Sequence, residues 1–275
     1  MYDIIELKHL AEQGDVQAQF RLGFYYEQVQ DYEEAVYWYS KVASRGFAQA
    51  QHHLGLCYAS GRGVKQDYAE AVRLFTLAAN QDYKEAQFDL GYCIAHGHGV
   101  ELDFDEAVKW YTKSAEQDYT KAQFNLGHCY ANGHGVTQNI TQATKWYTRA
   151  AELGDTNAQY TLGANCFREQ NYINAVKWFS QAAQAGDAQA QYNLGVCYAA
   201  GNGVPQNFEE AVVWYSKAAA QDDVDAQYNL GVCYIEGKGV KQDYEMASKL
   251  FTQAALRGDA GAKATLEDMI SKGLV

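Results

Sequence analysis

Four histidines stand in or beside two copies of one glycine-rich segment, and histidine is both a common metal ligand and a common general base. They are His96, His98, His128 and His134. Imidazoles in neighbouring loops can approach one metal ion. However, the middle position of the same Gly-x-Gly segment holds Arg62, Asn202 and Lys238 in other copies. We therefore interpret this position as one that accepts any polar residue, and we predict no metal site.

Six cysteines recur along the chain, one in each of six similar stretches of sequence. They are Cys57, Cys93, Cys129, Cys166, Cys197 and Cys233, and all but Cys166 follow the glycine of a Leu-Gly pair by two residues. A thiolate can act as a nucleophile or a metal ligand, but this spacing matches no zinc pattern. Equivalent positions in stacked helices lie roughly 8–10 Å apart, beyond the usual reach of a disulfide. We predict free thiols in the core and a reducing compartment.

The glycine-rich segment also invites comparison with phosphate-binding loops. It reads Gly-x-Gly-Val at 61–64, 97–100, 133–136, 201–204 and 237–240. A dinucleotide-binding loop needs a preceding strand and a third glycine, and both are missing here. No Ser-His-Asp or Cys-His pairing stands out from the background. We therefore predict no nucleotide, no cofactor and no catalytic residues.

These residues belong to an internal repeat that is marked by the pair Leu-Gly. The glycines of the pair are Gly23, Gly55, Gly91, Gly127, Gly163, Gly195 and Gly231, which are 32 or 36 residues apart. The two short intervals arise because the first and fifth copies lack the Gly-x-Gly-Val segment. A four-residue deletion that leaves both flanks in register indicates a loop between two fixed elements.

Each repeat is predicted to form two helices. Over 188–200 of the sixth copy, apolar residues fall at helical spacing on two faces, which is typical of a helix packed between neighbours. Over 208–220, Phe208, Val212 and Tyr215 follow the same period. Tryptophan recurs at one position of this second helix, and Gly46, Gly154, Gly186 and Gly258 follow it as helix stops. Such helix pairs bury their apolar faces only when copies stack.

The prediction is an all-α protein, an α/α superhelical solenoid of about seven helix–turn–helix repeats within one domain, 1–275. The predicted repeats lie near 16–46, 47–82, 83–118, 119–154, 155–186, 187–222 and 223–258, with a C-terminal capping helix in 259–275. The formal net charge of −12 disfavours binding to nucleic acids and to anionic membranes. The N-terminal segment lacks the features of a signal peptide, and no stretch approaches the length of a membrane span. We therefore expect a cytoplasmic protein.

The unit AQYNLGVCYAAGNGVPQNFEEAVVWYSKAAA, at 190–220, closely resembles the Sel1-like repeat, a relative of the tetratricopeptide repeat. The matching features are Ala-Gln-x-x-Leu-Gly, Gly-x-Gly-Val, Trp-Tyr and Lys-Ala-Ala, and they cover nearly the whole chain. The resemblance implies a right-handed superhelix and a role as an adaptor or scaffold. It does not identify a partner.

The positions that vary within this fixed frame are the candidate binding residues. The residue before each Leu-Gly pair is Arg21, His53, Asp89, Asn125, Thr161, Asn193 or Asn229. Lys121, Asn132 and Arg168 extend the same polar arc of the first helix. In tetratricopeptide-like solenoids the first helices line the concave groove, where polar side chains can hold a peptide or a partner helix. The alternative is a solvated face without a ligand.

We therefore predict a monomeric scaffold that binds another protein or a peptide in its concave groove, and is not an enzyme. The alternative is the β-lactamase-like or penicillin-binding activity that is attributed to cysteine-rich relatives. Some of those relatives carry two bridged cysteines per repeat, whereas this chain has one. A nitrocefin hydrolysis assay distinguishes the two hypotheses.

Overall fold

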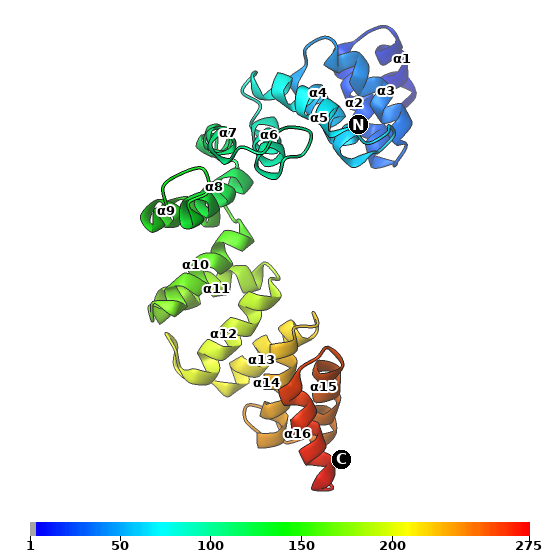
Figure 1. Ribbon diagram of the computed structural model, residues 1–275. Helices are drawn as coiled ribbons and strands as arrows, with labels where there is room; N and C mark the ends of the chain where they lie inside the picture. Colours follow the sequence, from blue (N-terminus) through cyan, green and yellow to red (C-terminus); the bar gives the residue numbers. More distant parts are fainter. Residues whose placement is uncertain (1–3) are drawn as a thin grey trace. The chain divides into compact units, whose positions relative to one another are not determined.

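The computed structural model describes residues 4–275, which form sixteen α-helices and no strand (Figure 1). The first helices of the repeats are α2 Val16–Gln28, α4 Ala48–Ser60, α6 Lys84–His96, α8 Thr120–Asn132, α10 Thr156–Arg168, α12 Ala188–Ala200 and α14 Val224–Glu236. The second helices are α3 Tyr32–Ala43, α5 Tyr68–Ala79, α7 Phe104–Glu116, α9 Ile140–Glu152, α11 Tyr172–Gln184, α13 Phe208–Ala219 and α15 Tyr244–Leu256. Helix α1, Ile4–Glu12, precedes them, and α16, Ala260–Ser271, follows. The predicted helix pairs and the solenoid of helical repeats are confirmed.

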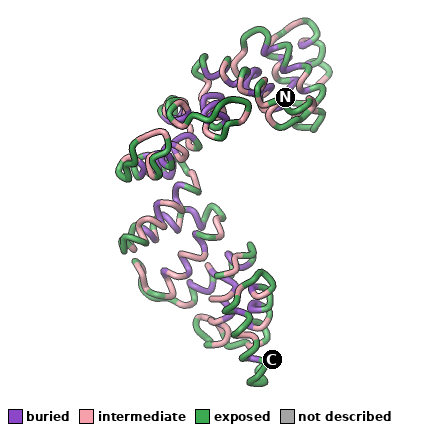
Figure 2. The backbone as a smooth tube through the Cα atoms, in the orientation of Figure 1, coloured by how far each residue is buried: buried purple, intermediate pink, exposed green. Residues whose placement is uncertain are grey.

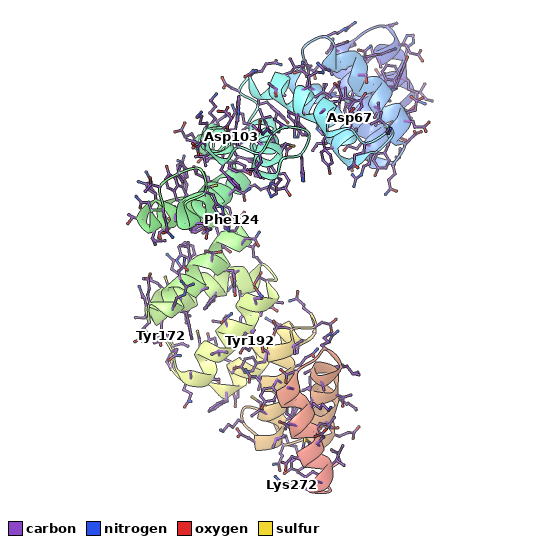
Figure 3. The ribbon with its side chains drawn as sticks, viewed as in Figure 1. Asp67, Asp103, Phe124, Tyr172, Tyr192 and Lys272 are labelled. Atoms are coloured by element: carbon purple, nitrogen blue, oxygen red, sulfur yellow. The ribbon has the colours of Figure 1, made fainter. Side chains whose placement is uncertain are left out.

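The helix ends follow from local sequence. The side chains of Asp67 and Asp103, which precede α5 and α7 (Figure 3), accept hydrogen bonds from the backbone N–H groups of the residue three positions on. This satisfies one of the amides that a helix N-terminus leaves unpaired. At the other end, Gly186 follows α11 with φ 100°, a backbone conformation that favours glycine. The predicted helix stops at the equivalent glycines are confirmed by positive φ values.

The chain divides into two compact units, residues 1–150 and 151–275. In the first unit, α1 to α8 each pack against the next helix in the chain, and the ring of Tyr147 in α9 contacts Phe124 in α8. In the second unit, α10 to α16 pack in the same consecutive manner. Buried residues lie where helices face one another (Figure 2). Each unit therefore has a core that runs along its stack of helices.

The glycine of each Leu-Gly pair allows the two helices of a repeat to approach closely. A Cβ atom on Gly195 would stand 2.6 Å from the ring of Tyr215, which is buried. In the other repeats the corresponding distance is 2.6 to 3.0 Å, again to a tyrosine or phenylalanine of the second helix. Real Cβ atoms are not found at such distances from a ring, so a larger residue would force the helices apart.

A buried glutamine joins each repeat to the helix before it. The Nε2 atom of Gln191 donates to the carbonyl of Ala183 at the end of α11, over 3.0 Å. The same bond recurs in all seven repeats, from Gln19, Gln51, Gln87, Gln123, Gln159, Gln191 and Gln227. Each of these carbonyls also accepts the backbone N–H of the residue three positions on, so the glutamine supplies a second hydrogen bond at the helix end. The Ala-Gln of the repeat therefore has a structural role.

The Gly-x-Gly segment packs on the preceding repeat, and four of the five residues at its middle position rest on an aromatic ring. A Cβ atom on Gly135 would overlap the backbone carbonyl of Phe104 at the start of α7. The close approach places His134 against the Phe104 ring, with ring centroids 5.2 Å apart. His98 lies 4.9 Å from the ring of Tyr68 in the same way. Arg62 lies over Tyr32, and Lys238 lies over Phe208. These four side chains are flat or cationic, whereas Asn202 holds the same position in the sixth repeat, so the position accepts polar residues of several kinds.

At the C-terminal end, α16 corresponds to the predicted capping helix in 259–275. Within residues 4–275, no helix is both long enough and apolar enough to span a bilayer.

Candidate partner-binding site

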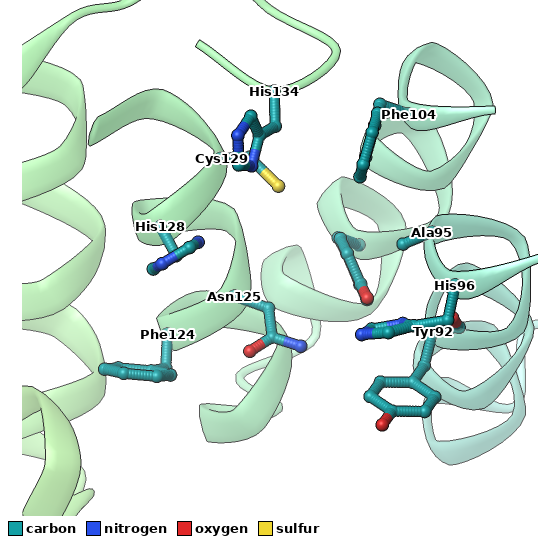
Figure 4. Close-up of a pocket in the computed structure, with 10 residues that line it drawn as sticks. Tyr92, Ala95, His96, Phe104, Phe124, Asn125, His128, Cys129 and His134 are labelled. Carbon is teal, nitrogen blue, oxygen red and sulfur yellow. The ribbon is translucent and has the colours of Figure 1, made fainter. Parts of the chain in front are cut away.

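A pocket of about 470 Å³ opens between two successive first helices, α6 and α8 (Figure 4). Aromatic rings line much of it: Tyr92, Phe104, Tyr111 and Phe124. The remaining lining residues are Ala95, His96, Asn125, His128, Cys129 and His134. The volume lies within the range of about 300–1,000 Å³ that is typical of ligand pockets. An apolar wall with a few polar groups is also typical of such pockets.

Packing within the chain fixes the rings at the pocket's rim. Tyr92 and His96 stand one turn apart on α6 and stack with centroids 4.0 Å apart. The Nδ1 atom of His96 lies 2.8 Å from the carbonyl oxygen of Tyr92, so Nδ1 carries the proton and donates. His128 lies 6.0 Å from His134, which rests on Phe104. The His96 ring is therefore held in place by its stacking on Tyr92 and its hydrogen bond to the Tyr92 carbonyl.

Asn125 is the predicted binding residue that the structure places in this pocket. It is half-buried on α8, and it hydrogen-bonds the hydroxyl of Tyr111. Burial raises the pKa of Tyr111, so this hydroxyl stays neutral, although the bond to Asn125 acts in the opposite direction. The bond to Tyr111 uses one of the hydrogen-bonding groups of the Asn125 amide, and the amide retains the others for a ligand that enters the pocket.

The other residues at the Asn125 position occupy separate places along the stack. In the first unit, Arg21 lines a smaller pocket with Leu7 and Leu10. In the second unit, Asn229 lines a pocket with Tyr192, Tyr228 and Asp259, and its Nδ2 atom lies 3.5 Å from the Tyr192 hydroxyl. The Asn229 pocket thus lies between successive first helices, α12 and α14, whereas the Arg21 pocket lies between α1 and α2.

Some of the predicted residues are engaged within the chain. Asp89 accepts from Nε2 of His52 over 2.7 Å, and His53 contacts Glu27 over 3.2 Å. The hydroxyl of Thr161 donates to the carbonyl of Asn157, one turn back along α10. In the same manner, Asn193 donates to Gln189 and Asn132 donates to His128. Arg168 donates to Asn165 over 3.2 Å. Lys121, Asn132 and Arg168 are exposed.

Sequence reasoning missed the partners of His53 and Asp89. Glu27 accepts hydrogen bonds from Tyr39 over 2.6 Å and from His53, and these bonds lower the pKa of its carboxyl group, with His53 as the largest cause. His52 packs against the ring of Tyr83 while it holds Asp89. These contacts join successive repeats. The only signal in the sequence was the unusual pair of adjacent histidines in one helix.

The histidines and cysteines of the described residues do not gather into a metal-binding cluster. Among residues 4–275, no group of three or more His, Cys, Asp or Glu side chains is placed to hold a metal ion. All six cysteines are free, and all except Cys166 are buried, as the sequence predicts for core residues. Burial raises the pKa of Cys57 and of Cys129 to about 11. A thiol in this state is a weak nucleophile at neutral pH.

Consecutive helix pairs that stack along the chain define a protein of the α-solenoid class. The chain belongs to the Sel1 repeat family, because the Sel1 repeat model matches seven successive segments. The segments are 16–47, 48–83, 84–119, 120–155, 157–187, 188–223 and 224–259. Sel1 repeats form a non-catalytic scaffold fold, and proteins built from them generally serve as scaffolds for protein interaction.

Two solved structures are similar to this chain along most of its length. One is a protective antigen of uropathogenic Escherichia coli strains, with 33% identity and a TM-score of 0.94 over 99% of this chain. This chain corresponds to 60% of the length of that antigen. The other is a Sel1 repeat protein of Oxalobacter formigenes, with 34% identity, a TM-score of 0.76, and coverage of 86% of this chain and 98% of that one. Comparison with curated proteins gives no match.

Proposed function

We propose that this protein is a cytoplasmic, monomeric adaptor that binds a segment of another protein in the groove formed by its first helices. The observation that carries the proposal is the pocket between α6 and α8, where aromatic rings surround the amide of Asn125. Rigid aromatic walls supply apolar contact area, and an amide can pair with the backbone of a bound segment. In the second unit, the pocket around Asn229 combines tyrosine rings with an amide in the same manner.

Further features support the rest of the proposal. Free thiols are typical of a reducing compartment, which favours the cytoplasm. The net charge of −12 repels phosphate backbones and anionic lipids, so a protein partner is favoured over nucleic acid or a membrane surface. The raised pKa of the thiols and the scaffold fold favour binding without catalysis.

The test is an affinity pulldown from native lysate with the full chain and a groove variant. The variant carries Asn125→Ala, Asn193→Ala and Asn229→Ala. A matched control carries three substitutions at exposed positions of the second helices or their ends. These are Asn80→Ala, Thr144→Ala and Thr252→Ala.

The proposal expects the groove variant to lose a partner that the wild type and the control variant retain, while circular dichroism shows equal helicity in all three. Retention of the same partner by the groove variant would place binding outside the first helices. A wild-type protein that captures nothing above background would argue against the adaptor role itself.

A further inference from the structure

The pocket between α6 and α8 carries histidines and a tyrosine that the repeat frame does not require. Its structural counterpart in repeats six and seven lies 104 residues further along the chain. The frame residues Phe104, Tyr111, Asn125 and Cys129 there become Phe208, Tyr215, Asn229 and Cys233. By contrast, the rim residues Tyr92, His96 and His128 become Val196, Ala200 and Val232. Small apolar residues are therefore compatible with the same packing, and the three polar rings at the rim call for a separate explanation.

The side chains at the rim of the pocket are accessible to a ligand. His96 and Tyr92 face Asn125 and Phe124 across the opening (Figure 4). Because Nδ1 of His96 is engaged with the Tyr92 carbonyl, Nε2 is the ring atom that remains for a ligand. His96, His128 and His134 are exposed, whereas the floor residues Tyr111 and Cys129 are buried. The pocket thus has an apolar floor, and imidazole nitrogen atoms lie at its rim.

The charge of the pocket differs from that of the chain. None of its ten lining residues is Asp or Glu, although the chain as a whole carries a net charge of −12. On α6, one turn before Tyr92, the carboxylate of Asp89 is occupied by His52. On α8, Lys121 is exposed two turns before His128. The N–H group of His128, the imidazolium form of His96 and a lysine on α8 are suited to carboxylates, while the rest of the acidic surface repels them.

We propose that the pocket between α6 and α8 binds an aromatic side chain of a partner segment, and that His96 and His128 at its rim bind Asp or Glu residues beside that side chain. The apolar floor accepts the ring, which can pack edge-on against Phe124 and Phe104. The His128 imidazole donates to one flanking carboxylate, and His96 donates from Nε2 in its imidazolium form, since its Nδ1–H is engaged with the Tyr92 carbonyl. The Asn125 amide pairs with the segment's backbone. The inference rests on the proposed function and names the chemistry of the partner.

The test is a selection of displayed, fully randomised heptapeptides on the full-length protein, followed by affinity measurements on synthetic copies of the selected peptides. The test variant carries His96→Ala and His128→Val, the residues that the chain itself uses at the corresponding positions, so its fold is retained. The comparison variant carries Asn193→Ala and Asn229→Ala in the second unit. Circular dichroism checks each protein before selection.

The proposal expects selected peptides to share an aromatic residue flanked by Asp or Glu. Their affinity is expected to fall at least about tenfold on the pocket variant, since hydrogen bonds to charged groups are involved. Replacing the flanking acids of a selected peptide with lysine is expected to abolish binding to the wild type.

Other outcomes overturn the inference in distinguishable ways. Selected peptides that are basic, or that lack an aromatic residue, would refute the assigned chemistry and leave the adaptor role standing. Peptides that lose affinity only on the Asn193→Ala, Asn229→Ala variant would move the binding site to the second unit. A selection that enriches no peptide would count against both this inference and the proposed function.

Discussion

Substitution of the Leu-Gly glycine tests the packing that holds the two helices of a repeat together. In Gly195→Ala, the new Cβ atom would stand 2.6 Å from the Tyr215 ring, and this ring is only 4% exposed and cannot swing into solvent. Overpacking of this kind costs about 1–3 kcal/mol. The gain in helix propensity from glycine to alanine offsets at most about 1 kcal/mol of that cost. We therefore expect Gly195→Ala to lower the free energy of unfolding by up to about 2 kcal/mol.

A second helical glycine provides the control. A Cβ atom on Gly261 in α16 would meet Asp259 at 3.3 Å and Tyr228 at 3.5 Å, so a small shift accommodates it. Gly261→Ala is expected to be neutral or stabilising in urea unfolding followed by circular dichroism. Combining Gly195→Ala with Tyr215→Ala should cost less than the sum of the single changes, because the clash disappears. Equal urea midpoints for Gly195→Ala and Gly261→Ala would refute the packing argument.

Three further predictions concern the interior. Gln191→Leu removes the bond to the Ala183 carbonyl, which keeps its bond from the Gly186 N–H, so the change should cost about 0.5–1.5 kcal/mol in urea unfolding, whereas an exposed Gln→Leu change should cost little. The pKa of Glu27 is lower in the folded protein than in the unfolded chain, so the carboxylate stabilises the fold at pH values above its unfolded pKa. This stabilisation is lost as the pH falls through the folded-state pKa. Glu27→Gln should therefore reduce the loss of stability in acid, and an acid-unfolding profile equal to that of the wild type would contradict this. Cys166, the least buried cysteine, should react first with a disulfide reagent, and Cys166→Ser should remove only that fast phase.

The helices were predictable because their signals repeat. Seven copies of the Leu-Gly pair placed each first helix, and the missing loop residues located the turns. The buried role of the cysteines was also predictable, since they share the apolar stripe of Leu194. A periodic pattern of this kind depends only on spacing within one helix.

Contacts between repeats were not predictable from the same pattern. The pairing of Asp89 with His52 and the stacking of His134 on Phe104 depend on how one repeat sits on the next. Nothing in the spacing within one helix specifies that register. For the same reason, the sequence listed Asn125 and the histidines as separate candidates, and only the fold joins them in one pocket.

The most direct test of the adaptor role is photo-crosslinking from inside the pocket. A photoreactive benzoylphenylalanine replaces Tyr92 in one protein and Leu77 in a control. These positions have nearly equal exposure, 40% and 41%, but Leu77 lies on the second helix α5. After irradiation in native lysate, the account predicts a crosslinked partner from position 92 and none from position 77. Crosslinking of the same partner from position 77, with none from position 92, would contradict it.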